Sequence, residues 1–121
     1  MSAETTFNAT LKAAAAVTAI VGAGADARIY PDVVGQEVDL PCVAYTRTAT
    51  EVTSTLSQPA TDLRATLEVF CMAGSRLAAE ALADEVVTAA GAAWFVLTSR
   101  RAEYDDEQRL FAAVLTFDHW E

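Results

Sequence analysis

The alternation of residue types between Leu63 and Cys71 constrains the fold of this chain more than any other feature. Every second residue is apolar: Leu63, Ala65, Leu67, Val69 and Cys71. The positions between them hold Arg64, Thr66, Glu68 and Phe70. Successive side chains of a strand point to opposite faces, so a period of two predicts a half-buried strand. Such a strand is typical of an antiparallel sheet that is covered on one face only.

Two stretches have the composition of helices that can cover this face. The first, Ser2 to Val21, is rich in alanine and starts at a residue suited to capping. Its last turns hold several β-branched residues, which weaken a helix. A break near Ala16 is therefore an alternative to one continuous helix. Glycines at 22 and 24 end it. The second, Arg76 to Ala90, follows the capping candidate Ser75, and its expected apolar face holds Ala78, Leu82, Val86 and Ala89.

The remaining segments predict extended chain in two hairpins. Arg28 to Tyr30 is a short extended piece that Pro31 stops, and Pro41 introduces a strand from Cys42 to about Glu51. The polar stretch Val52 to Thr61 predicts a long hairpin loop before the Leu63 strand.

The last third predicts a second hairpin from Trp94 to Tyr104 and from Gln108 to Trp120. Pairing Phe95 with Phe117 and Leu97 with Leu115 centres its turn on Asp106. This register requires a turn of three or five residues.

These elements predict a single α+β domain over residues 1–121, in the order α-β-β-α-β-β. We expect a four-stranded antiparallel sheet of two hairpins with both helices packed on one face. An edge strand of this sheet is a candidate for pairing with another copy. The opposite face is expected to be largely polar and to carry Thr46, Thr48, Arg64, Thr66, Glu68, Ser99 and Arg101, with Phe70 or Trp94 as a bulky addition.

Charge and hydropathy exclude several classes of protein. The net charge of −9, from 17 acidic and 8 basic residues, argues against free-standing nucleic-acid binding. No run approaches the roughly 18 uncharged apolar residues of a membrane span. The N-terminus lacks the basic region of a signal peptide, so we expect a protein made and used without secretion, and no membrane partner.

No group of residues predicts catalysis, a cofactor or a metal site. The single histidine, His119, adjoins Asp118, and neighbours on a strand point to opposite faces. Cys42 and Cys71 lack the spacing of a zinc site, so we expect free thiols. The acidic run Asp105 to Glu107 is interpreted as a solvated turn rather than a cation site. We therefore expect a protein that is not an enzyme.

Several segments in this order resemble the tail completion, or tail terminator, proteins of long-tailed phages and gene transfer agents. After the N-terminal helix come Arg28-Ile29-Tyr30-Pro31 and Leu40-Pro41-Cys42-Val43-Ala44-Tyr45. Then follow the strand from Arg64 to Cys71, the second helix, and a last strand from Phe111 to Phe117 that ends in Asp118-His119-Trp120.

The resemblance implies a structural virion protein of the tail or neck, assembled in the host cytoplasm. It implies a ring, usually a homohexamer, that caps the head-proximal end of the tail tube. The implied partners are the tail tube protein and the head–tail connector or stopper, and DNA passes through the channel without specific binding. The two hairpin tips are expected to protrude and contain no predicted core residues, so we expect partner contacts there. The first tip holds Val52, Thr53, Ser54, Thr55, Leu56, Ser57 and Gln58, and the second holds Asp105, Asp106, Glu107 and Gln108.

Two alternatives stay open at this point. One is a different ring of the neck, a head–tail adaptor or stopper protein. The other is a small ferredoxin-like ligand-binding or regulatory module, which predicts a stable dimer with a pocket between helices and sheet. Solution mass and binding to purified tail tubes discriminate among the three.

Overall fold

The computed structural model describes residues 2–24, 27–32, 39–55 and 58–120, with the backbone alone for 53–55 and 58–62. The helices are α1 (Ala3–Ala13), α2 (Ala15–Val21) and α3 (Arg76–Ala92). The strands are β1 (Ile29–Pro31), β2 (Cys42–Thr55), β3 (Gln58–Ala73), β4 (Val96–Asp105) and β5 (Leu110–Trp120). The strands of this described part form one sheet in the order β1-β2-β3-β5-β4.

The expected four-stranded antiparallel sheet in the order α-β-β-α-β-β is wrong. The sheet is five-stranded and mixed, because the short piece ending at Pro31 joins it as β1. Ile29 pairs with Val43 in a parallel register, and the amide of Val43 donates to the carbonyl of Arg28 (2.9 Å). Three residues are too few to show a period, so the pattern alone did not reveal this strand.

The N-terminal helix is also divided, as its β-branched residues favoured, and the break lies at Ala14, two residues before Ala16. Ala14 has an extended backbone (φ −86°, ψ 110°), and its amide donates to the carbonyl of Leu11. Its own carbonyl accepts the amide of Thr18 and so starts α2. The β-branched residues that follow favour an interruption of the helix, although not at a defined residue.

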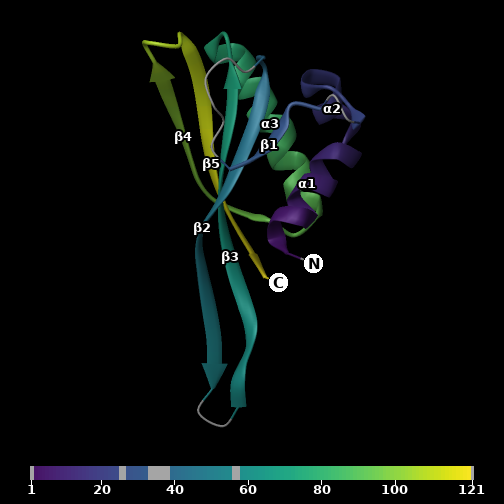
Figure 1. Cartoon of the computed structure of the whole chain (residues 1–121), viewed down its shortest axis with the longest axis vertical. Coiled ribbons are helices and arrows are strands. Elements are labelled where there is room, and N and C mark those ends of the chain that lie inside the picture. The colour runs from purple at the N-terminus through teal and green to yellow at the C-terminus, as the bar shows by residue number, and fades with distance from the viewer. Residues whose placement is uncertain (1, 25–26, 33–38, 56–57, 121) are drawn as a thin grey trace.

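All three helices lie on one face of the sheet, and the core fills the space between them (Figure 1). Of the predicted alternating residues, Ala65, Leu67, Val69 and Cys71 are fully buried in this core, whereas Leu63 is 38% exposed. Phe7 of α1 lies at the centre of an aromatic cluster. Its ring meets those of Tyr45 and Phe95 edge-on, at centroid distances of 5.2 and 5.3 Å.

The third helix begins where the sequence predicted, because the Ser75 hydroxyl accepts the amide of Ala78 (3.2 Å). Its buried face is rotated slightly from the expected one. Leu82 and Val86 are buried as expected, whereas Ala78 is exposed and Ala89 is only partly buried. The residues that α3 buries are Ala79, Leu82, Ala83, Val86 and Ala90.

The predicted loop from Val52 to Thr61 is largely strand. β2 continues to Thr55 and β3 starts at Gln58, so the two strands stay paired well beyond the rest of the sheet. β5 ends at Trp120, opposite Arg64, which leaves the segment beyond this point as a two-stranded ribbon. We call this ribbon, together with Thr50 and Glu51 at its base, the arm (residues 50–55 and 58–63); it projects from one end of the molecule (Figure 1).

The C-terminal hairpin forms in a different register from the expected one. Leu97, not Phe95, lies opposite Phe117, and a bulge between Leu97 and Ser99 shifts the register by one residue. Asp105 then pairs with Leu110, so the turn has the four residues 106–109 instead of three or five. A bulge inserts an extra residue into one strand, and this changes the parity on which the prediction depended.

No helix in the described ranges is long and apolar enough to cross a membrane.

Candidate assembly surfaces

The two predicted contact segments lie at opposite ends of the molecule. The arm projects at one end, and the turn between β4 and β5 lies at the other (Figure 1). Within the first segment, the backbone at 53–55 and at Gln58 is paired strand. Leu56 and Ser57 lie outside the described residues. The structure therefore does not bring the predicted residues together into one site, but separates them into two surfaces.

The arm carries exposed apolar residues where it leaves the sheet. Val52 and Leu63 are cross-strand partners and are 59% and 38% exposed. They continue the face that holds buried Ala65 and Leu67, but the helices no longer cover them. A two-stranded hairpin is marginally stable by itself in water. A contact that covers these two exposed side chains would therefore stabilise the arm.

Arg47 braces the arm on the helix side of the sheet. Its guanidinium donates to the Glu4 carboxylate at the start of α1, with Nη2 and Nε 2.6 and 3.0 Å from Oε1. It also donates to the Thr50 hydroxyl (2.9 Å). A planar guanidinium that holds a carboxylate by two donors fixes direction as well as distance. The contact therefore joins the first turn of α1 to the strand that becomes the arm.

Arg64 occupies the corresponding place on the helix-free face. It forms an ion pair with Glu51 across the arm, and its Nε lies 3.9 Å from Asp118 of β5. The guanidinium also lies 5.8 Å from the ring centre of Trp120, within the range of a cation–π contact. The base of the arm is thus held from both faces, by one arginine on each.

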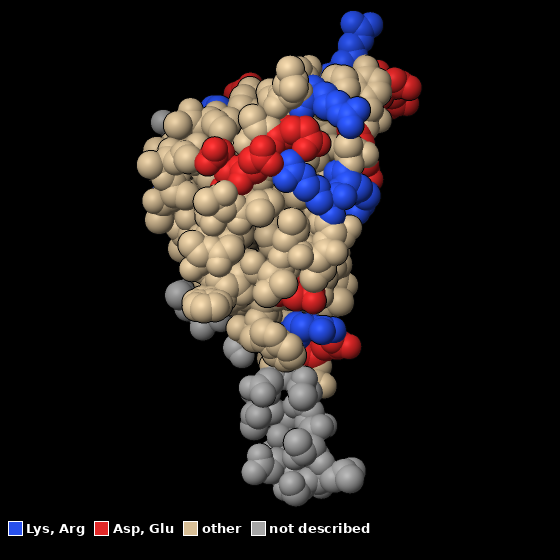
Figure 2. All heavy atoms as spheres, turned by 180° about the vertical axis from the view of Figure 1, so that it is seen from behind, with Lys and Arg blue, Asp and Glu red and all other residues tan. Residues whose placement is uncertain are grey.

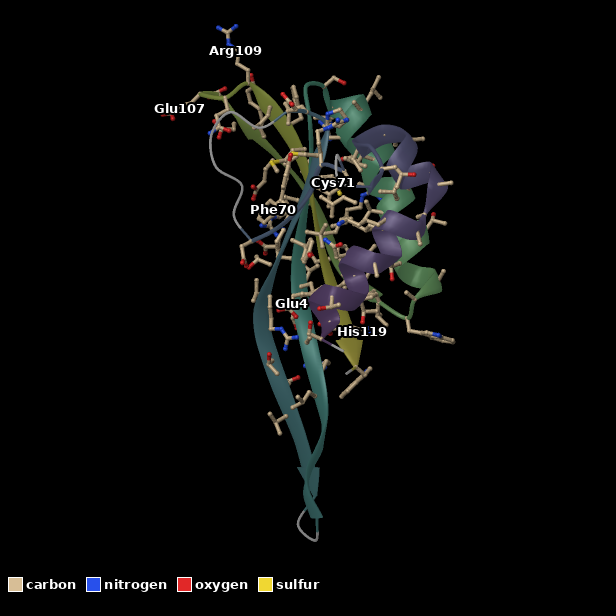
Figure 3. The ribbon with its side chains drawn as sticks, turned by 45° about the vertical axis from the view of Figure 1, so that its right-hand side comes forward. Glu4, Phe70, Cys71, Glu107, Arg109 and His119 are labelled. Carbon is tan, nitrogen blue, oxygen red and sulfur yellow. The ribbon has the colours of Figure 1, made fainter. Side chains whose placement is uncertain are left out.

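The opposite tip is a tight, charged turn. The Asp105 carboxylate accepts the amides of Glu107 and Gln108 (2.9 and 3.2 Å), which orders the turn from within. Arg109 has a positive φ of 53° and is exposed. Glu107 and Arg109 project from this end of the molecule (Figure 3). Arg109 was not among the predicted contact residues, because the predicted strand from Gln108 to Trp120 includes it.

A surface hollow of about 430 Å³ lies beside this turn on the helix-free side. Its floor is apolar, with Phe70 and Met72 of β3 and Leu110 and Ala112 of β5. Phe70 points away from the helices, unlike its neighbour Cys71 (Figure 3). Carboxylates from Glu103 and the turn line the rim. The expected bulky residue on this face is therefore Phe70, whereas Trp94 lies in the α3–β4 connection, before β4 begins.

β4 is an edge strand on which nearly every side chain is exposed. Its arginine side chains form ion pairs with carboxylates of other residues. Arg100 donates to Glu80 and Asp84 of α3 (2.6 and 2.9 Å), and its pKa is raised mainly by the hydrogen bond to Glu80. Basic and acidic side chains lie side by side on the surface (Figure 2). The backbone edge of β4, in contrast, is unpaired in the described sheet.

The two cysteine side chains and the histidine ring pack against other residues of the fold. Cys42 and Cys71 are free and buried on opposite faces of the sheet, and burial raises the pKa of both. His119 stacks on Phe95, with ring centres 4.0 Å apart. The described part of the chain contains no group of three or more His, Cys, Asp or Glu that could hold a metal ion.

Comparison with known proteins identifies the family. The family model described as tail completion protein gp17 matches residues 8–121, which is nearly the whole chain. A solved structure of the virion of a native gene transfer agent particle contains a chain with the same fold. The TM-score is 0.68 and the sequence identity 15%, over 98% of this chain and 92% of that one. No curated protein matches the sequence.

The chain belongs to the tail completion protein family. This confirms the resemblance and, with it, the expectation of a structural protein of the virion tail. Such a protein assembles with other tail and head components. Membership of a structural family also agrees with the expectation that the chain is not an enzyme.

Proposed function

We propose that this protein is the tail terminator, a ring that caps the head-proximal end of the tail tube and joins it to the head connector. The observation that carries the proposal is the separation of two protruding surfaces at opposite ends of one sheet. A joint between two assemblies needs one contact surface for each of them. The arm and the β4–β5 turn are suited to these two roles.

The family match and the shape support this proposal in different ways. The family describes completion of a tail, which is a terminal step of assembly. The arm supplies paired strands without a covered face, and exposed apolar residues at its base. Surfaces of this kind gain stability when another protein covers them.

The charge of the chain agrees with a ring around a DNA passage. With a net charge of −9, the surface repels the phosphate backbone, so DNA in a central channel would not be retained. We propose a homohexameric ring, with tail tube protein on one side and the connector or stopper on the other.

Shortening the arm tests the proposal. In the variant, an Asn-Gly turn replaces residues 53–62 and links Val52 directly to Leu63, its cross-strand partner. The variant is supplied to a phage or gene transfer agent that lacks its own copy. We expect an unchanged melting temperature in the purified protein, together with filled heads and separate tails in the particle preparation.

The matched control is Leu77→Ser, because Leu77 is 85% exposed on α3 and belongs to neither tip. This variant should join heads and tails normally. Normal joining by the arm variant would overturn the proposal. Binding of the purified protein to DNA-filled heads but not to tail tubes would assign it to the adaptor or stopper class instead.

A further inference from the structure

The described sheet has two open backbone edges, one on each side. On one side, β4 is unpaired along its outer edge from Val96 to Asp105. On the other side, β1 covers β2 only at Val43–Tyr45. From Thr46 onward, the outer edge of β2 has no partner strand in the described part of the chain.

The directions of these two edges are complementary. β2, β3, β5 and β4 are antiparallel in succession, so β4 runs opposite to β2. Rotation about a ring axis lying roughly along the strands preserves strand direction. β4 of one copy therefore meets β2 of the next in the antiparallel sense, and the helices of both copies stay on the same face.

We infer that β4 of one copy pairs with the Thr46–Val52 stretch of β2 in the next copy, so that the sheet continues from subunit to subunit. This inference rests on the ring proposed above and assigns the surface that closes it. The partner is a second copy of this chain. Each copy offers one edge and accepts the other, and this head-to-tail relation is the one that generates rings.

Charge favours this pairing over the two-fold pairing of β4 with itself. β4 carries Arg100 and Arg101 at its centre, so self-pairing would bring these like charges of two copies close together, although each is also paired with carboxylates of its own chain. The β2 stretch instead carries Glu51, which is exposed and forms an ion pair with Arg64 of its own chain. Glu51 and Arg101 both lie on the helix-free face, since they pair with Arg64 and Val114 in their own sheet.

The short strand β1 determines where the neighbouring strand can lie. It ends at Pro31, which has no amide hydrogen to donate, and the amide of Asp32 turns back to the carbonyl of Tyr45 (2.6 Å). An incoming β4 therefore meets the β2 edge only beyond Tyr45. The register of the contact is set between this point and the arm.

Engineered cysteines test the pairing, since the two native thiols are buried. Ala49, on the helix-free face of β2, is replaced by cysteine. This change is combined with a cysteine at Ser99, Arg101 or Glu103 in turn, which face the same side of β4. The matched control combines it with Ala102→Cys, because Ala102 is also exposed but lies on the helix side of β4. The purified full-length protein is oxidised and analysed on a denaturing gel without reductant.

We expect a ladder of covalent oligomers from at least one of the three same-face pairs and none from the control. Covalent dimers from a β4 cysteine alone would show two-fold pairing and overturn the inference. Oligomers in solution without any ladder would also overturn it, while leaving the proposed ring intact. A chain that stays monomeric at every concentration overturns the self-pairing, and the head–tail joining assay then decides independently whether the proposed function survives.

Discussion

The two halves of the β2–β3 hairpin differ in what surrounds the same pair of strands. Near Val43 and Val69 the strands have β1 and β5 on their outer sides and helices above them, and every side chain on that face is buried. Beyond Arg64 the strands have only each other, and Val52 is 59% exposed. The part of the hairpin within the five-stranded sheet, which we call the body, is therefore held by its neighbours, whereas the arm leaves backbone and side chains uncovered.

This difference predicts that stability and assembly depend on different parts of one continuous hairpin. A substitution in the body should lower the free energy of unfolding, whereas a substitution in the arm should leave it nearly unchanged and affect binding. The free energy of unfolding of a domain is only about 5–15 kcal/mol, so one destabilising substitution in the body removes a large part of it.

The largest expected effect comes from Phe7→Ala in the body. Phe7 is fully buried and its ring contacts those of Tyr45 and Phe95, so its removal leaves a cavity at the centre of the core. We expect a loss of about 3–5 kcal/mol in urea unfolding. The matched arm substitution, Val52→Ala, should cost less than about 0.5 kcal/mol. Equal losses in the two variants would abolish the distinction between body and arm.

A smaller effect is expected from the buried thiols at alkaline pH. Burial raises the pKa of Cys42 to about 11, and it also raises the pKa of Cys71. In the unfolded chain a thiol loses its proton near pH 8.5. The unfolded state then binds fewer protons than the folded state, so the free energy of unfolding falls as the pH rises from about 8.5 to about 11.

This dependence is measured by chemical unfolding at several pH values in the wild type and in Cys42→Ser. The variant should show a shallower fall, because serine does not titrate in this range. Identical slopes in the two proteins would contradict a thiol that is protected by the body.

The smallest effect on stability is expected from Arg47→Gln at the junction of body and arm. Ion pairs of this exposure contribute about 1 kcal/mol or less, so the global unfolding midpoint should move little. The bond to Glu4 also holds the arm in its direction. Amide exchange in the arm should therefore accelerate, while exchange in α3 stays unchanged. A uniform acceleration over both regions would show that Arg47 supports the whole fold instead.

Sequence reasoning succeeded where burial imposed a period. Ala65 to Cys71 alternates because one face of β3 meets the helices, whereas Leu63, at the start of the predicted pattern, is 38% exposed. Ser75 begins α3 by a local capping bond. The prediction is wrong where the sequence shows no hydrophobic period. The stretch Val52 to Thr61 contains few apolar residues and no alternation, so its composition is typical of a loop, although β2 and β3 continue into it as a paired ribbon.

The two protruding segments were predicted only in outline. The acidic turn was placed correctly between the last two strands, but the bulge after Leu97 moved its far end to Arg109. The clamp of Arg47 on Glu4 joins residues 43 positions apart, and no local pattern in the sequence encodes such a distance. Which backbone edges of the sheet are unpaired depends on the strand order. The sequence did not predict this order, because the short β1 joins the sheet and covers part of the β2 edge.

The positions of the two tryptophans give the molecule an intrinsic optical signal. Trp94 follows α3 and is 83% exposed, and Trp120 closes β5 beside the arm and is 55% exposed. Indole rings in water emit at longer wavelengths than indole rings in an apolar contact. A neighbour seated on β4 or at the base of the arm would therefore shift the emission to the blue. Assembly of the proposed ring can thus be followed in real time by fluorescence, without any attached dye.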